Sequence, residues 1–185
     1  MKKTLLLSIL ISFLLGGCFY PFSTFTTQKK EVVLPKNGPE WLINSKKEGY
    51  LTQIGITNNI DKKEFDFHKK RALIKASHKL TKKIYIKVLK LYKDYEGKTN
   101  DALIYDKDIK KSAEHISLKA LTHSKLINTW VSPNNELFVQ ISVASDIVTE
   151  LIQNNSKLLF KVNQNLYKNF LSNRAKKEIN IILEK

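Results

Sequence analysis

The side chains in this sequence that could ligate a metal or act as nucleophiles include four histidines and a single cysteine. The histidines are His68, His78, His115 and His123. No two of them have the spacing of two ligands on one face of a helix, and His115 and His123, although they share a strand parity, lie eight residues apart. There is no Gly-x-Ser-x-Gly nucleophile elbow, and Gly55 is not part of a phosphate-binding loop. We therefore expect no metal, no cofactor and no catalytic activity.

The single cysteine, Cys18, ends a short apolar segment at the start of the chain. Lys2 and Lys3 precede an apolar run over residues 5–15, and two glycines separate this run from the cysteine. A charged start, a short apolar run and small residues at a cleavage point are typical of a secretory signal. The run is too short to span a bilayer, which requires about 17 to 25 residues. Because no second cysteine exists, no intramolecular disulfide can form.

The four residues Leu15-Gly16-Gly17-Cys18 resemble the lipobox of bacterial lipoproteins. The resemblance implies a signal peptide over residues 1–17, cleavage before Cys18, a diacylglycerol on its sulfur and a fatty acid on its amine. Two or three acyl chains, each contributing about 0.8 kcal/mol per buried methylene, hold a protein on a membrane. Phe19, rather than Asp, follows the cysteine, and by the sorting habit of many diderm bacteria this indicates the outer membrane. The alternative is an ordinary secretory signal with a chance cysteine.

Residues 18–38 are rich in Phe, Ser, Thr and Pro and have neither helical nor alternating periodicity, so we interpret them as a lipidated tether. A flexible segment of about twenty residues has a root-mean-square reach of roughly 25 Å. Alternatively, the aromatic residues lie in the membrane interface, which aromatic rings favour. These residues are Phe19, Tyr20, Phe22 and Phe25. In both cases the folded part begins near Pro39.

The periodicity beyond Pro39 predicts a strand, a long helix and a hairpin. Residues 50–57 alternate as in a strand, and residues from about 62 to 95 have apolar side chains at steps of three or four, so this face must pack on a sheet. The apolar stripe consists of Leu73, Ala76, Leu80, Ile84, Val88, Leu91 and Tyr95. Residues 96–111 are interpreted as an exposed loop. A long strand over 116–131, a turn at residues 132–135 and a strand over 137–143 predict a β-hairpin.

The rest of the chain is predicted to be helical. Ser145 is expected to cap a helix that Asn154 and the two residues after it interrupt, and a last apolar pattern reaches Ile182. Trp41 and Trp130 are interpreted as core anchors rather than ligand platforms. The order of elements predicts an α+β domain over residues 39–152, followed by a C-terminal helical extension over 153–185.

One face of the long helix is strongly basic. Ten Lys or Arg residues and no Asp or Glu occur between His68 and Lys93. The lysines opposite the apolar stripe are Lys75, Lys79, Lys82, Lys90 and Lys93. This face is either only exposed to water, or it contacts anionic lipid headgroups, lipopolysaccharide phosphates or an acidic protein partner.

The whole chain is basic too, with 32 Lys or Arg against 17 Asp or Glu and a formal net charge of +15. Nucleic acids also bind basic ridges. An exported lipoprotein does not meet them, however, and the sequence has no recognisable nucleic-acid-binding motif. We therefore expect no nucleic-acid partner.

The order of several short motifs resembles the Lpp-twenty family of membrane-associated twenty-kilodalton lipoproteins. The matching pieces are Pro39-Glu40-Trp41, Ile54-Gly55-Ile56, Ala72 and Ala76 of the long helix, and the hairpin from Trp130-Val131 to Phe138-Val139. The resemblance covers about residues 38–152. It implies a dodecin-like β-α-β-β fold, in which one helix lies across a small antiparallel sheet. The Lys-rich helix and the residues after Asn154 depart from the family pattern.

The family resemblance implies a non-catalytic, lipid-anchored outer-membrane protein, facing either the periplasm or the surface, with a structural or interaction role at the cell envelope. Some relatives are flagellar and form part of disk or ring assemblies, and the N-terminal domain of the flagellar H-ring protein is similar. A flagellar-motility-associated lipoprotein is therefore the alternative. The implied partners are the membrane, through the N-terminal lipid, and a protein partner or a second copy of the chain.

Overall fold

The computed structural model describes residues 35, 37–96, 106–160 and 179–183. The elements in chain order are α2 (Glu40–Ile43), β1 (Tyr50–Thr57), the 3-10 turn η1 (Lys62–Glu64), α3 (Phe65–Glu96), α4 (Asp106–Thr122), β2 (Lys125–Val131), β3 (Leu137–Ala144) and α5 (Ser145–Leu159). Residues 179–183 form a further helical turn. The predicted α+β class is confirmed, whereas the lipobox, most of the tether and much of the predicted C-terminal extension lie outside the described residues. None of the described helices is long and apolar enough to cross a membrane.

The sheet is antiparallel, with the strand order β1-β3-β2. Strand β1 pairs with β3 from Tyr50 opposite Ala144 to Thr57 opposite Leu137. Strand β2 pairs with the other side of β3, with a shift in register between Leu126 and Asn128. The predicted first strand and the predicted hairpin are therefore confirmed. Because β3 lies between the other two strands, all its residues before Ala144 are buried.

The predicted long strand over 116–131 is wrong in its first half, because Asp106–Thr122 form helix α4. The residues on the buried face of α4 are Ile109, Ala113, Ile116 and Ala120, at helical steps of three and four. The strand prediction was based on the shared parity of Ile116, Leu118 and Ala120. In the structure Leu118 is 53% exposed, so this parity does not correspond to a buried face. Residues 106–111 of the predicted loop are helical as well.

Helix α3 lies directly against β1 at Gly55. A Cβ atom at this position would clash with the carbonyl oxygen of Ala72 and would lie 2.7 Å from the backbone nitrogen of Ala76. Both alanines are fully buried. The backbones of the helix and the strand can come this close because all three residues are small.

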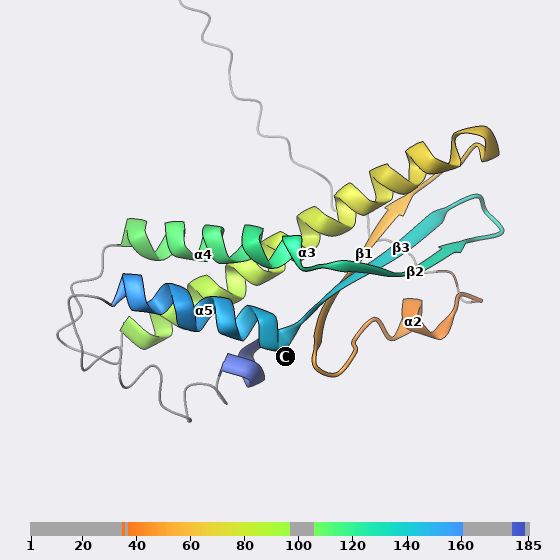
Figure 1. Ribbon diagram of the computed structural model, residues 1–185. Coiled ribbons are helices and arrows are strands. Elements are labelled where there is room, and N and C mark those ends of the chain that lie inside the picture. Colours follow the sequence, from red (N-terminus) through yellow and green to blue (C-terminus); the bar gives the residue numbers. More distant parts are fainter. Residues whose placement is uncertain (1–34, 36, 97–105, 161–178, 184–185) are drawn as a thin grey trace, which may run out of the picture. The chain divides into compact units, whose positions relative to one another are not determined.

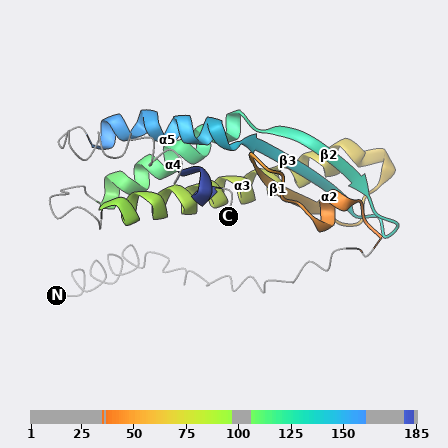
Figure 2. The same cartoon turned by 90° about the horizontal axis from the view of Figure 1, so that it is seen from below.

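The apolar stripe of α3 was expected to pack on a sheet, and this holds only for its first part. Of its residues, Ala76, Leu80, Ile84, Val88 and Leu91 are buried and Leu73 is half-buried, while the Tyr95 side chain lies outside the described residues. The first part of α3 packs on β1 and β3, and α3 also packs on α4. Figures 1 and 2 show α3 extending from the sheet to the layer formed by α4 and α5. The stripe therefore has two different partners along its length.

The sheet face away from α3 is covered in part by the segment that contains α2. The Thr52 Oγ1 hydroxyl and the Gln140 side-chain amide both donate to the carbonyl oxygen of Ser45, which ties this segment to the sheet. The predicted core anchors Trp41 and Trp130 are only half-buried. Trp130 packs on Phe138 with ring centroids 5.5 Å apart, so it supports this second face rather than the main core.

Helix α5 differs from its prediction at both ends. Ser145 does not cap it but lies in its first turn and donates to the Gly49 carbonyl oxygen at 2.9 Å. The predicted interruption at Asn154 is wrong, because α5 continues to Leu159 across the predicted domain boundary at residue 152. Ile152, Ser156 and Phe160 are buried, and this continuous buried face explains why the helix persists.

The buried hydroxyl of Tyr92 joins α3 to α5. It lies 3.3 Å from the Ile152 carbonyl oxygen and 3.3 Å from Ser156 Oγ, and the ring meets Phe160 edge to face. Burial raises the pKa of the Tyr92 hydroxyl well above its ordinary value, and the hydrogen bond with Ser156 offsets only part of this rise. The fold therefore favours the protonated phenol.

Replacing Gly55 by Ala should lower the free energy of unfolding by about 3 kcal/mol or more, because the added methyl group meets helix backbone that cannot rotate away. Urea denaturation of the purified variant measures this loss. Gly49→Ala is the matched control: the space around Gly49 is open, and only its φ of 73° opposes a side chain, at a cost of about 1 to 2 kcal/mol. An equal loss in the two variants would contradict the close approach at Gly55.

Tyr92→Phe should cost about 1 kcal/mol near neutral pH, because the hydroxyl bonds are lost. The raised pKa of Tyr92 stabilises the fold fully below the pKa of the unfolded chain, and this contribution is lost as the pH rises above about 10. The difference in unfolding free energy between wild type and variant should therefore narrow between about pH 9 and about pH 11. The control is Tyr85→Phe, because the Tyr85 hydroxyl has no hydrogen bond to the described residues. If the difference in unfolding free energy between wild type and Tyr92→Phe stays constant over this pH range, the raised pKa of Tyr92 does not contribute to stability.

Candidate functional site

The five lysines predicted to contact an anionic surface are all exposed on α3. They do not form one equivalent set, because the structure gives some of them internal partners. Lys75 Nζ donates to the Ile56 carbonyl oxygen at 2.9 Å, and Lys79 Nζ donates to the Ile54 carbonyl oxygen at 3.0 Å. Lys75 and Lys79 therefore cover the outer edge of β1 and occupy two of its carbonyl groups.

This edge is the side of β1 that does not pair with β3. Carbonyl groups on such an edge can pair with another chain, and lysine is one of the residues that prevents this. Partial burial lowers the pKa of the Lys79 ammonium, and the charge of Lys75 lowers it further. The burial and the repulsion both arise because the side chains of Lys75 and Lys79 lie against the edge of β1.

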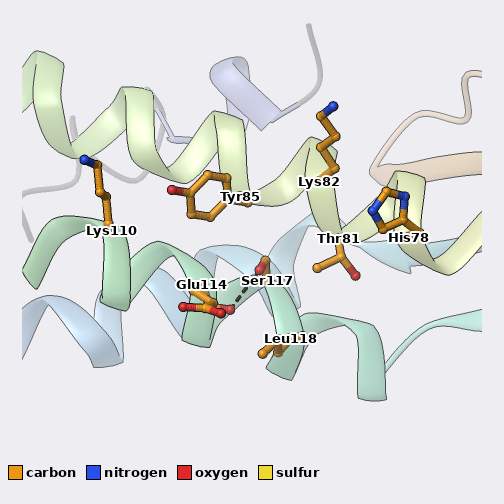
Figure 3. A pocket seen from close by; sticks show the side chains of 8 residues that line it. All are labelled: His78, Thr81, Lys82, Tyr85, Lys110, Glu114, Ser117 and Leu118. Atoms are coloured by element: carbon orange, nitrogen blue, oxygen red, sulfur yellow. Dashed lines mark hydrogen bonds between the residues drawn. The ribbon is translucent and has the colours of Figure 1, made fainter. Parts of the chain in front are cut away.

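Lys82 belongs to a different surface, a groove between α3 and α4 with a volume of about 410 Å³ (Figure 3). The groove is lined by His78, Thr81, Lys82, Tyr85, Lys110, Glu114, Ser117 and Leu118. Ser117 Oγ donates to the Glu114 backbone carbonyl oxygen, so this serine is engaged in its own helix. Thr81 Oγ1 is buried without a hydrogen-bond partner among the described residues. The groove thus combines lysines, a carboxylate and apolar surface, an arrangement without a recognisable catalytic pair in the part that the structure describes.

A second group of lysines, which the sequence did not single out, lies further along α3. Lys83 and Lys87 are half-buried and one helical turn apart, and Lys46, from the turn before β1, acts electrostatically on both. We call Lys46, Lys83 and Lys87 the basic corner. The spacing of four residues from Lys79 could have identified Lys83 and Lys87. No local pattern could have identified Lys46, because folding brings it to α3.

The positive charges of the basic corner repel one another, and this lowers the pKa values of two of its lysines. Burial is the largest cause that lowers the pKa of the Lys83 ammonium, and repulsion by Lys46 adds to it. The pKa of Lys87 is lowered by burial, then by Lys83, and then by Lys46 and Lys90. Lys87 Nζ donates to the Ile182 carbonyl oxygen of the C-terminal turn. The remaining predicted lysines, Lys90 and Lys93, are exposed beyond this corner.

The histidines do not come together. His68 is buried, and its Nε2 accepts the Asp61 backbone N–H at 3.3 Å, while its Nδ1 has no partner among the described residues. The side chains of His78, His115 and His123 are exposed. In the described part of the chain, no group of histidine, cysteine and acidic side chains could hold a metal ion.

Comparison with known proteins gives no family. No protein-family model and no curated protein sequence matches this chain. The resemblance to the Lpp-twenty family therefore stays a prediction based on the motifs quoted above.

Lys79→Met should lower the free energy of unfolding by about 1 kcal/mol, because the Ile54 carbonyl oxygen loses its ammonium donor while the apolar stem is kept. Lys82→Met removes the same charge from an exposed side chain without a hydrogen bond to the described residues, and should change stability by less than about 0.5 kcal/mol. Urea denaturation at equal ionic strength compares them. Equal effects would show that the Lys79 bond contributes nothing beyond the change in net charge.

Proposed function

We propose that this chain is a lipid-anchored protein of the bacterial outer membrane with a non-catalytic, structural or interaction role at the cell envelope. The observation that carries the proposal is the run Leu15-Gly16-Gly17-Cys18 after a short apolar segment. The run places the chain's single thiol, a soft nucleophile, where its sulfur can take a diacylglycerol, and cleavage before Cys18 would free the amine for a fatty acid. Two or three acyl chains then supply the membrane affinity.

The charge of the domain suits such an anchor. The described residues begin at Pro35, and a flexible tether of the length between Cys18 and that residue would have a root-mean-square reach of roughly 25 Å from the headgroups. Each lysine near an anionic leaflet contributes about 1 kcal/mol of attraction. An anchored basic domain therefore favours contact with its own membrane.

Intact-mass analysis of the protein extracted from membranes should show a chain that begins at residue 18 and carries added lipid mass. Cys18→Ser should leave a folded domain that is released from the membrane or remains uncleaved, because the thiol that accepts the lipid is lost. Phe19→Ser is the matched control, since it changes the neighbouring side chain, keeps the thiol and should leave lipidation intact. Recovery of an unmodified chain with another N-terminus would reject the proposal.

A further inference from the structure

Two lysines of the basic corner differ from Lys75 and Lys79 in that the described fold offers their ammonium groups no acceptor. Lys75 and Lys79 donate to strand carbonyls, whereas the ammonium groups of Lys46 and Lys83 have no hydrogen bond or ion pair with the described residues. Lys83 is half-buried all the same. A partly buried ammonium without an acceptor is unfavourable, and it becomes favourable when an anion supplies the missing acceptor.

The three cations of the corner are held by separate parts of the fold. The carbonyl oxygen of Ser45 accepts two side-chain hydrogen bonds from the sheet, which fixes the backbone next to Lys46. Lys83 projects from α3, and Lys87 is held by its bond to Ile182. Figure 2 shows the C-terminal turn beside α3, in agreement with the bond between Lys87 and Ile182. The fold itself therefore fixes the backbone positions from which the three lysines extend.

We propose that the basic corner binds the phosphate group of an anionic lipid headgroup, with Lys46 and Lys83 as donors and Lys87 as a third cation. A phosphate oxygen accepts charge-assisted hydrogen bonds from ammonium groups, and a single phosphate can accept bonds from both lysines. Partial burial of Lys83 and Lys87 reduces the screening that weakens fully exposed pairs. The inference rests on the proposed function only for the source of the phosphate, the membrane to which the chain is anchored.

A bound phosphate has a consequence that attraction to a charged surface alone lacks. Burial and mutual repulsion lower the pKa of Lys83 in the free protein. A phosphate in contact with its ammonium favours the charged form, so binding should raise the pKa of Lys83 toward its ordinary value. A titration of the Lys83 side-chain signals by NMR, with and without inorganic phosphate, measures this change.

The test uses the chain from residue 18 with Cys18→Ser, so that acyl chains cannot bring it to vesicles. Phosphatidylcholine vesicles with or without phosphatidylglycerol are sedimented with the wild-type corner and with Lys46→Gln/Lys83→Gln. Lys87 stays unchanged because it bonds to the C-terminal turn. The matched control is Lys70→Gln/Lys119→Gln, two exposed lysines elsewhere on α3 and α4 with the same loss of charge. Circular dichroism verifies that all three proteins are folded.

Lys46→Gln/Lys83→Gln should weaken binding to phosphatidylglycerol vesicles about tenfold or more, and the control by about threefold or less. Equal weakening in both variants would overturn the site, because the attraction would then follow net charge alone. If inorganic phosphate binds at Lys83 but the protein does not bind the vesicles, the phosphate that the basic corner recognises is not that of a lipid headgroup, and the proposal is overturned. An absence of binding to both probes would overturn the proposal as a whole. None of these outcomes alters the lipid mass at Cys18, so the anchor is tested separately.

Discussion

The contact between Gly55 of β1 and the backbone of α3 at Ala72 and Ala76 sets the geometry of the sheet and of the helix that covers it. It brings two backbones closer than any side chain larger than hydrogen at Gly55 would allow. Once this distance is fixed, the helix has one height above the sheet and one alignment with the strand edge. The large apolar residues of β3 and of the following turns of α3 then fill the space on either side of the contact.

The alignment explains why the lysines of α3 have unequal roles. Lys75 meets Ile56 and Lys79 meets Ile54, so the helix advances along β1 in the direction opposite to the strand. The next members of the row, Lys83 and Lys87, come level with the start of β1 and the turn before it. Strand carbonyls cap the first two ammonium groups. The charge of Lys46 instead acts on the later two ammonium groups. The lysines are therefore evenly spaced along the helix, but their surroundings differ.

The length of α3 connects this edge to a second packing region. Beyond the sheet its buried face turns to α4, and α5 is held near it through Tyr92 and Ser156. The C-terminal turn adds Ile179 and Leu183 to the same core and offers a backbone carbonyl to Lys87. The basic corner is therefore built from α3 and the C-terminal turn, which are anchored in the core, and from the turn before β1, which hydrogen bonds tie to the sheet.

Elements with local signals could be predicted from the sequence. The alternation of residues 50–57, the steps of three and four in α3 and the turn before Leu137 depend only on near neighbours, and each of them is found in the structure. Helix α4 was missed because Ile116, Leu118 and Ala120 fit a strand parity as well as a helix, and only packing against α3 and α5 decides which face is buried. The exposed lysines of α3 were also predictable, but their partners were not. Lys46 reaches Lys83 only after β1 pairs with β3 and α3 folds back over the sheet, because contacts between distant residues exist only in the tertiary structure.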